Sequence, residues 1–301
     1  MVEVARSKVR RTGWTSVTPG AHVATRSPEL PDLLQAWCLV LPETAAFTHL
    51  TAAELQGWWL PARVPAPVFV NVPRGDRHPQ RRGLAISRTT ATAAVTVTGL
   101  PVTAAVETLL ACARDLDLLD LVPLADSALR LGHCSMEELE ERAKDRRPGA
   151  RMLRRAIPLL DARSESPWES VMRVLHTAAG IPVEPQHVVR DARGGFVARA
   201  DLWLVGTRRL HEYDGEVHRD RDTHRADLDR DRRLVETGWQ RCGYTSNEVL
   251  RRGGSIIASA DAVLGRGWDP VRLDSWRALV RASLYGPGGR TRVRTRWRTD
   301  G

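Results

Sequence analysis

The sequence contains almost no lysine. Of its 45 basic residues only Lys8 and Lys144 are lysines, and arginine supplies the rest of a net charge of +9. Arginine makes planar, bidentate contacts to phosphates and to base edges. This balance therefore favours a polyanionic partner, above all nucleic acid. A GC-rich genome, whose codons favour Arg and Ala, is the alternative explanation for the bulk charge.

Cysteine is also scarce, and its spacing excludes two classes of site. No Cys-x-x-Cys pair occurs, and the four cysteines lie far apart at Cys38, Cys112, Cys134 and Cys242. This pattern argues against a zinc site or a disulfide framework and predicts buried free thiols in a reducing cytosol. No stretch approaches the ~20 apolar residues that span a bilayer. The basic residues 1–11 lack the apolar run of a signal peptide. We therefore expect a cytoplasmic protein with no membrane partner.

The length and patterning predict two domains. At ~100–200 residues per domain, 301 residues suffice for two, and 42% apolar and 27% charged residues are ordinary globular values. Helices and strands are mixed, so the fold class is α/β (α+β). We expect a smaller α+β domain over residues 1–135, a helical connector over 136–163, a second domain over 164–265, and a basic, loosely ordered tail over 266–301.

The first domain shows alternating helix and strand patterns. Apolar spacing predicts helices over residues 29–41 and 48–55, followed by strands over 68–73, 84–88 and 94–98. Residues 74–82 form a basic turn between the first two strands, which we interpret as a hairpin. Arg74 and Arg81 in this turn are candidate contacts to nucleic-acid phosphates. Further helices are predicted over 101–112 and 116–131, and Ser135 begins another with a capping box to Glu138.

The second domain reads as a helix, a three-strand meander, a helix, a strand and a helix. Ser166 and Pro167 are typical of a helix start. Strands follow over residues 183–189, 196–204 and 209–213. A charged helix over 223–237 precedes a strand over 239–244, and a last helix begins at 245.

Three acidic residues fall at unusual places in this pattern. Glu169 lies in the first turn of the helix, Asp201 within an apolar strand, and Glu212 near the end of the next strand. A buried acid costs several kcal/mol unless something compensates it. A hard divalent cation such as Mg²⁺ or Mn²⁺ is a natural compensation, and it can polarise a phosphate and lower the pKa of an attacking water. Salt bridges with the many arginines are the alternative.

The order of these residues resembles a known family. Six short segments of the second domain look like the PD-(D/E)XK nuclease superfamily. They are SESPWES at 164–170, GIPVEPQ at 180–186, RADLW at 199–203, EYDGEVH at 212–218, RDRRL at 230–234 and GW at 238–239. More closely, it resembles the very-short-patch-repair-like branch, a domain of unknown function in many actinobacterial proteins. The resemblance covers about residues 164–250 and implies a restriction-endonuclease-like core.

The resemblance also implies roles for individual residues. The metal ligands would be Glu169, Asp201, Glu212 and the backbone carbonyl of Tyr213. The catalytic set would add Asp214 and His218, with His218 orienting or deprotonating the water, while Arg199 and Arg230 would hold a phosphate. Two departures are visible in this sequence. Asp214 stands at the superfamily's lysine position, and Gly243 stands where members often carry an arginine.

The first domain resembles an AbiEi-type antitoxin or transcriptional-regulator region. The matching text is PGAHVA at 19–24, THLTAAELQG at 48–57, GLPVT at 99–103 and DSALR at 126–130. The resembling region begins at Trp14 and only about a dozen residues precede it, so the winged helix expected in front is mostly missing. The resemblance implies a regulatory domain and a partner from a toxin–antitoxin or defence locus.

Together these features lead to one functional hypothesis and two rivals. The resemblance implies a Mg²⁺-dependent endodeoxyribonuclease or nickase that acts on DNA with a metal-activated water. The first rival is a non-catalytic DNA-binding or antitoxin-like regulator that keeps the nuclease fold as a scaffold. The second is a protein-interaction module of a defence locus. Target sequence and oligomeric state are not encoded in any motif.

Overall fold

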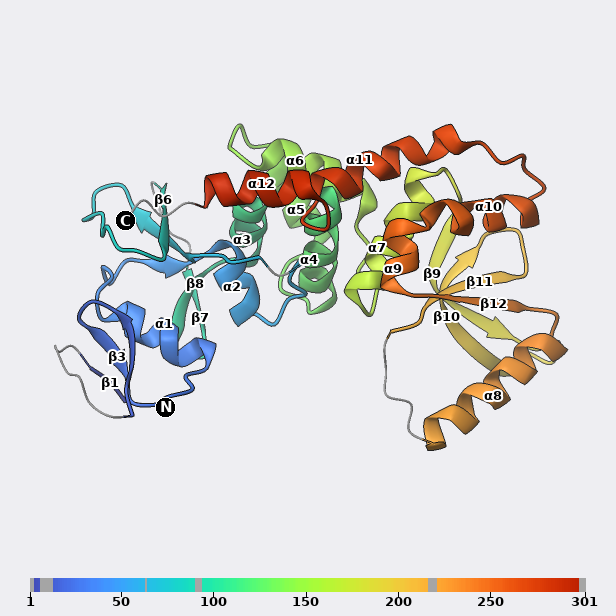
Figure 1. Ribbon diagram of the computed structural model, residues 1–301, viewed down its shortest axis with the longest axis horizontal. Coiled ribbons are helices and arrows are strands. Elements are labelled where there is room, and N and C mark those ends of the chain that lie inside the picture. Colours follow the sequence, from blue (N-terminus) through green and yellow to red (C-terminus); the bar gives the residue numbers. More distant parts are fainter. Residues whose placement is uncertain (1–2, 6–12, 63, 90–93, 216–220, 298–301) are drawn as a thin grey trace. The chain divides into compact units, whose positions relative to one another are not determined.

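The structure is a computed structural model that describes residues 3–5, 13–62, 64–89, 94–215 and 221–297. The chain divides into two compact units, and both are discontinuous in sequence. Unit 1 comprises Met1–Leu116, Cys134–Arg154 and Arg290–Gly301, and unit 2 comprises Asp117–His133 and Arg155–Gly289. Both mix helices with sheets, which confirms the expected α+β class (Figure 1).

Unit 1 is built on two small sheets. Three strands pair in the order β1-β3-β2 and five in the order β6-β5-β4-β8-β7. The strands are β1 (Val4–Ala5), β2 (Thr15–Thr18), β3 (Ala21–Val23), β4 (Ala46–Phe47), β5 (Val68–Pro73), β6 (Leu84–Thr89), β7 (Ala94–Val97) and β8 (Leu100–Thr103). The last of these was expected to lead directly into a helix and is instead a strand. The helices are α1 (Leu30–Cys38), α2 (His49–Leu55), α3 (Ala105–Cys112), α5 (Met136–Ala143) and α6 (Ala150–Ala156).

The core of unit 1 forms where α1 packs on the five-stranded sheet. Leu34 and Trp37 of α1 meet Phe47 and Val70 from neighbouring strands, and all four are buried. The predicted capping box at Ser135 is confirmed, because its hydroxyl accepts from the Glu138 backbone and the Glu138 carboxylate accepts from the Ser135 backbone. The apolar spacing in the sequence thus located the helices that cover this sheet.

The hairpin expected around residues 74–82 is wrong. Strands β5 and β6 pair in parallel, with Val68 opposite Leu84 and Pro73 opposite Thr89. Residues 74–83 therefore run from the end of β5 back to the level at which β5 began, where β6 starts. Arg88 fixes the start of this connection by donating to the backbone carbonyls of Asp76, at 3.0 Å, and of Arg74. Turn-forming residues between two apolar runs do not show whether the connection is a tight turn between antiparallel strands or a longer crossover between parallel strands.

Unit 2 contains the predicted helix and meander. Its sheet has the order β12-β11-β10-β9, with three antiparallel strands and β12 parallel to β11. The strands are β9 (Val183–Arg190), β10 (Phe196–Leu204), β11 (Arg209–Tyr213) and β12 (Gln240–Tyr244). Helix α7 (Pro167–Ala178) packs against β9, β10 and β11, and α8 (Arg221–Glu236) packs against β10 and β12 (Figure 1). Helices α9 (Ser246–Arg251) and α10 (Gly253–Val263) follow.

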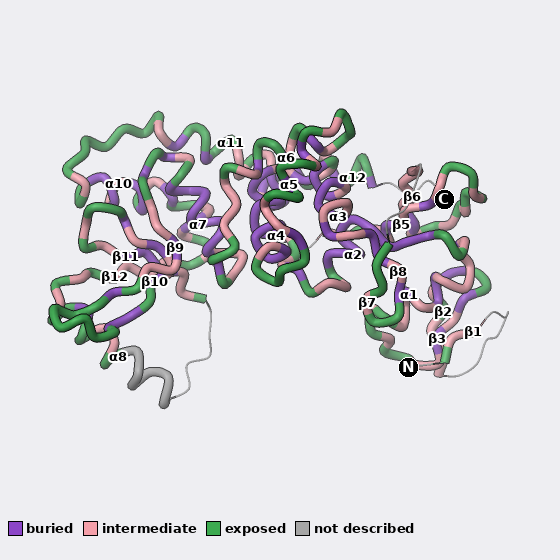
Figure 2. The backbone as a smooth tube through the Cα atoms, turned by 180° about the vertical axis from the view of Figure 1, so that it is seen from behind, coloured by how far each residue is buried: buried purple, intermediate pink, exposed green. Residues whose placement is uncertain are grey.

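Helix α4 (Leu118–Arg130) belongs to unit 2, although the sequence pattern assigned it to the first domain. It is buried along most of its length (Figure 2). On α4, Asp126 accepts hydrogen bonds from the Ser170 hydroxyl at 2.6 Å and from Arg173, both on α7. The two helices are thus joined by a buried ion pair, which the sequence did not reveal because its partners lie far apart along the chain.

The loosely ordered tail is also wrong for residues 270–297. This stretch forms the 3-10 helix Pro270–Leu273, α11 (Asp274–Ala282) and α12 (Pro287–Arg296). Its arginine content suggested disorder, but Trp276 and Leu284 are buried in unit 2. The Leu284 backbone N–H donates to both oxygens of Asp120, each at 3.0 Å. A few apolar residues among the arginines suffice to order this segment.

Candidate functional site

The three predicted acids come from a helix end and two paired strands of unit 2. In the β10–β11 register Leu202 lies opposite His211 and Trp203 opposite Leu210, so the next pair places Asp201 opposite Glu212. Glu169 lies in the first turn of α7, where the Ser166 hydroxyl accepts from its backbone N–H and Pro167 occupies the first helical position. The cap that the sequence predicted therefore fixes where Glu169 lies on the helix.

Asp201 is the most perturbed of the acids. Burial, reinforced by the charges of Glu169 and Glu212, raises its pKa to about 7, although a hydrogen bond from the Tyr213 backbone opposes this. That bond is 2.7 Å long and ends on Oδ2 of Asp201. The direction of the shift shows that both other acids are close enough for their charge to be felt. The structure thus brings together the three residues that the sequence singled out.

Glu169 is buried and partly satisfied by uncharged donors. One of its oxygens, Oε2, accepts from the Glu165 backbone N–H and from the Gln186 side chain, each at 2.8 Å. Gln186 has a positive φ of 55° on strand β9, a conformation uncommon outside glycine. Both donors are uncharged, and they fix the orientation of the Glu169 carboxylate.

Glu212 is neutralised by arginines. Its Oε2 accepts from Nε of Arg241 at 2.5 Å, and its Oε1 accepts from Nη2 of Arg230. Arg241 also reaches Asp214, with 2.6 Å between Nη2 and Oδ1. Burial alone would lower the pKa of Arg241, but its bond to Glu212 and the charges of Glu212, Asp214 and Asp231 raise it overall. Arg241 therefore stays charged and links the two acids.

Gly243 makes this linkage possible. It lies opposite Glu212 in the β11–β12 register and two residues after Arg241, on the same side of the strand. A Cβ at position 243 would come within 1.7 Å of Asp214 Oδ2. Position 243, where the family resemblance implied an arginine, is thus a glycine whose lack of a side chain leaves room for Asp214 in its pair with Arg241.

The fit to a divalent cation is mixed. Glu169 and Asp201 suit one, because two carboxylates close together in a buried place favour a hard cation. Glu212 does not suit one in this arrangement, because both of its oxygens already accept from guanidinium groups. Within the described ranges, no three or more His, Cys, Asp or Glu side chains form a group ready to hold a metal.

The remaining predicted residues have separate positions. Arg199 pairs with Glu165 at 2.7 Å, and Arg230 contacts the Arg199 carbonyl at 3.4 Å as well as Glu212. In unit 1, Arg81 donates to the Pro19 carbonyl at 2.7 Å. Arg74 lies in unit 1 along the wall of a cavity described below. His218 lies outside the described residues.

Sequence reasoning missed a buried histidine chain in unit 2. Nδ1 of His176 lies 2.8 Å from the Met172 carbonyl, its Nε2 lies 2.9 Å from Nδ1 of His211, and Nε2 of His211 lies 3.4 Å from the Tyr244 hydroxyl. Burial lowers the pKa of His176 to about 4; burial, followed by the neighbouring His176, lowers that of His211 to about 2. Both imidazoles are therefore neutral at pH 7.

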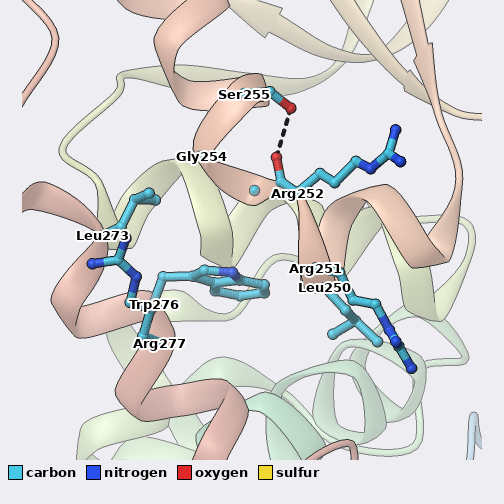
Figure 3. Close-up of a pocket in the computed structure, with 9 residues that line it drawn as sticks. Leu250, Arg251, Arg252, Gly254, Ser255, Leu273, Trp276 and Arg277 are labelled. Atoms are coloured by element: carbon cyan, nitrogen blue, oxygen red, sulfur yellow. Dashed lines mark hydrogen bonds between the residues drawn. The ribbon is translucent and has the colours of Figure 1, made fainter. Parts of the chain in front are cut away.

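A cavity of about 470 Å³ in unit 2 opens at the start of α10. Figure 3 shows the Trp276 ring lying across it, with the Arg252 side chain extending away from the ring. Gly253 allows this close packing, because a Cβ there would lie 3.0 Å from the Trp276 indole nitrogen. No residue predicted for the site lines this cavity, which is a packing feature beside the sheet.

Two further predictions concern thiols and membranes. All four cysteines are free; Cys112 and Cys134 are buried, and the other two are half-buried, so the expectation of unpaired thiols is confirmed. In the part of the chain that the structure describes, no helix has the length and apolar character needed to cross a bilayer.

Comparison with known proteins gives relatives without an assigned activity. The chain is 26% identical over 254 residues to Uncharacterized protein MT2308 of Mycobacterium tuberculosis strain CDC 1551 / Oshkosh and to Uncharacterized protein Rv2248 of strain H37Rv. Each alignment covers 83% of this chain and 92% of the relative, and so extends over both units. No protein-family model and no solved structure matches significantly. A functional argument therefore rests on the site itself.

Proposed function

We propose that unit 2 is a metal-dependent DNA endonuclease or nickase with Asp201 at its centre. The observation that carries this proposal is the environment of Asp201, a carboxyl group inside a strand whose pKa is raised by burial and by Glu169 and Glu212. Folded proteins rarely place three acids together without a compensating cation. Such groupings of perturbed acids concentrate at functional sites.

The roles of the side chains follow from their contacts. Asp201 and Glu169, with the Tyr213 carbonyl, would hold Mg²⁺ or Mn²⁺, and a bound ion would polarise the scissile phosphate and lower the pKa of a water. Arg230 and Arg199 would bind phosphate oxygens after leaving the acids with which they now pair, Glu212 and Glu165. Gln186 and the Glu165 backbone hold Glu169 in one orientation. Arg241 must release Glu212 for it to become a third ligand.

The test is cleavage of supercoiled plasmid by the purified full-length chain with Mg²⁺ or Mn²⁺. We expect nicking that is lost in Asp201→Asn and in Glu169→Gln. The matched control is Asp229→Asn, the same exchange at an exposed residue of α8 that pairs with Arg232. Cleavage that persists at the wild-type rate in both site variants would overturn the proposal.

A non-catalytic DNA-binding module is the second candidate, and the pairing of Glu212 favours it. Arg230 and Arg241 together neutralise this acid, so the fold is stable around it without an ion. This candidate predicts salt-sensitive DNA binding that is unchanged by EDTA, with no nicking at any Mn²⁺ concentration. If Mn²⁺ raises the melting temperature of the wild type but not of Asp201→Asn, the non-catalytic candidate is excluded and the metal-dependent nuclease is favoured.

A further inference from the structure

Unit 1 contains a cavity of about 650 Å³ that plays no part in the proposed nuclease site. Strands β5 and β6 form one side of it, and helices α3 and α5 with the segment that follows α5 form the other. Its volume lies within the range of ~300–1,000 Å³ that small-molecule sites occupy. The polar side of its lining consists mainly of guanidinium groups, from Arg74, Arg88, Arg114, Arg142 and Arg147.

Two of these arginines are neutralised by acids and three are not. Arg142 and Arg147 each pair with Glu107 at 3.0 Å, and Asp145 lies beside both. Arg114 donates only to the Ser87 hydroxyl, at 3.2 Å, and Arg88 only to backbone carbonyls. Among the described residues, neither of these nor Arg74 forms an ion pair. Three uncompensated positive charges therefore face one cavity.

The cavity wall also presents an unsatisfied acceptor. The side-chain oxygen of Asn71, on β5, is buried and has no hydrogen-bond partner among the described residues. An unsatisfied buried acceptor is unfavourable. A ligand that binds here would therefore carry an anionic group for the arginines and a hydrogen-bond donor for Asn71. A phosphate group attached to a hydroxyl- or amino-bearing body provides both and can occupy a cavity of about 650 Å³, whereas inorganic phosphate would fill only a small part of it.

The chain closes this cavity through Gly149. Its φ is +96°, and a Cβ there would lie 2.2 Å from the Leu110 carbonyl oxygen and 3.2 Å from the Arg114 side chain. Only glycine permits this approach of the segment after α5 to α3. The approach brings Arg147 and Pro148 against the same space as Arg114. The basic wall is thus built from four separate stretches of unit 1, which the fold brings to one cavity.

We infer that this cavity is a binding site for a phosphorylated small molecule of nucleotide size, with the phosphates at Arg74, Arg88 and Arg114. The apolar wall at Ile86, Leu110 and Pro148 would contact the base or sugar, and Asn71 would accept from a ligand hydroxyl or amine. Charge-assisted hydrogen bonds from several guanidinium groups are the strong contacts to phosphate. The site lies within unit 1 and does not depend on the nuclease proposal.

Calorimetric titration of the full-length chain in EDTA tests this inference, with AMP, ATP, inorganic phosphate and a short DNA duplex as separate probes. We expect ATP or AMP to bind at least tenfold more tightly than inorganic phosphate. Arg114→Gln and Arg74→Gln should each weaken nucleotide binding by about tenfold or more, as expected for loss of a charge-assisted hydrogen bond. The control, Arg151→Gln, changes an exposed arginine of α6 outside the cavity and should leave affinity unchanged.

The other outcomes decide against the inference. If neither nucleotide binds, or if binding is the same in both cavity variants, the site does not exist. If the duplex binds through Arg74 and Arg114 while no mononucleotide does, the arginines contact a nucleic-acid backbone and the small-ligand site is rejected. Melting temperatures of all variants confirm that each is folded. Because Asp201→Asn should not alter nucleotide binding, failure of this inference is distinguishable from failure of the proposed nuclease.

Discussion

Asp201 illustrates how a single carboxyl group links the candidate site to stability. Its pKa is about 7 in the folded protein against 3.8 for an unperturbed group, with burial as the first cause. A raised acid pKa favours the folded state at low pH, and this contribution is lost as pH rises through about 7. At pH 8 the folded protein must hold this negative charge beside two others, which destabilises it when no cation is present.

Asp201→Asn is therefore expected to stabilise the metal-free protein at high pH. We expect the free energy of unfolding to rise by about 1–3 kcal/mol at pH 8 and by clearly less at pH 5, where Asp201 already carries a proton. Urea denaturation in EDTA at the two pH values measures this. An equal change in the free energy of unfolding at pH 5 and pH 8 would contradict the assigned protonation of Asp201.

Arg241 is expected to compete with a metal ion for Glu212. In Arg241→Met the oxygens that Arg241 contacts on Glu212 and Asp214 are released, so Mn²⁺ binding should tighten by about tenfold, or ~1.4 kcal/mol. Isothermal titration with Mn²⁺ measures the change. The matched control is Arg232→Met on α8, where the arginine pairs with exposed Asp229. Unchanged or weaker Mn²⁺ affinity in Arg241→Met would show that Arg241 does not compete with the metal ion for Glu212.

At the scale of elements, strand β12 depends on a glycine at one position. In Gly243→Ala the new Cβ would overlap Asp214 Oδ2, so the Asp214–Arg241 bond must break or the strand must shift. We expect a loss of about 1–3 kcal/mol in the free energy of unfolding. Gly267→Ala, where a Cβ meets nothing within 4 Å, should stay within about 0.5 kcal/mol of wild type. Chemical denaturation of both variants checks this, and equal losses would rule out the steric explanation.

The histidine chain between α7, β11 and β12 makes these elements sensitive to acid. The pKa of His176, about 4, is lowered by burial, so the folded protein resists protonation that the unfolded chain accepts near pH 6.5. The contribution of neutral His176 to the free energy of unfolding is fully present above about pH 6.5 and is lost as the pH falls toward 4. The raised pKa values of Asp201 and Asp126, both buried, act in the opposite direction over part of this range.

A difference measurement separates these contributions. His176→Gln keeps a polar side chain on α7 but removes the titrating group. The stability of wild type relative to this variant should fall by about 1–3 kcal/mol between pH 7 and pH 4.5. Unfolding free energies at a series of pH values measure the difference. Parallel pH profiles for the two proteins would mean that His176 does not titrate as its burial requires.

The elements that the sequence predicted well are those with strong local signals. Ser166 and Pro167 marked the start of α7, and the alternating strands of the meander were placed within a few residues. What could not be predicted depends on pairing between distant residues. The parallel register of β5 and β6, and the extension of Arg241 past Gly243, have no local signature. The role of the three acids stays a prediction; salt bridges to arginines were the stated alternative, and Glu212 forms two of them, with Arg230 and Arg241.

At the scale of the whole molecule, the chain leaves unit 1 for α4, returns to unit 1, completes unit 2, and ends in unit 1 from Arg290. This path makes a linear division of the sequence misleading. Asp126 on α4 is fully buried and its pKa is raised to about 6, chiefly by burial, although Arg173 opposes the shift. Arg173 on α7 is itself almost fully buried. Unit 2 therefore requires residues that precede the predicted domain start by almost forty positions.

A fragment comparison tests this requirement. Residues 164–265 contain the candidate site but lack α4, so Arg173 loses its buried partner and the Leu284 segment is absent. Leaving a buried charge unpaired costs about 3–5 kcal/mol, a large part of the ~5–15 kcal/mol that stabilises a domain. We expect this fragment to unfold without a cooperative transition. Residues 117–289, which carry 134–154 as an insertion, should unfold cooperatively in urea followed by circular dichroism.

Full-length Asp126→Asn provides the link between the fragment and the ion pair. It keeps α4 and nearly the same volume but removes the charge opposite Arg173, so it should lose about 3–5 kcal/mol at pH 7. The loss should grow toward pH 5, because protonation of Asp126, whose pKa is raised to about 6, stabilises the folded wild-type protein and has no counterpart in the variant. A cooperative 164–265 fragment, together with a stable Asp126→Asn variant, would show that α4 merely covers unit 2. A 164–265 fragment without a cooperative transition, together with a destabilised Asp126→Asn variant, would establish α4 as part of the fold that positions Glu169 and Asp201.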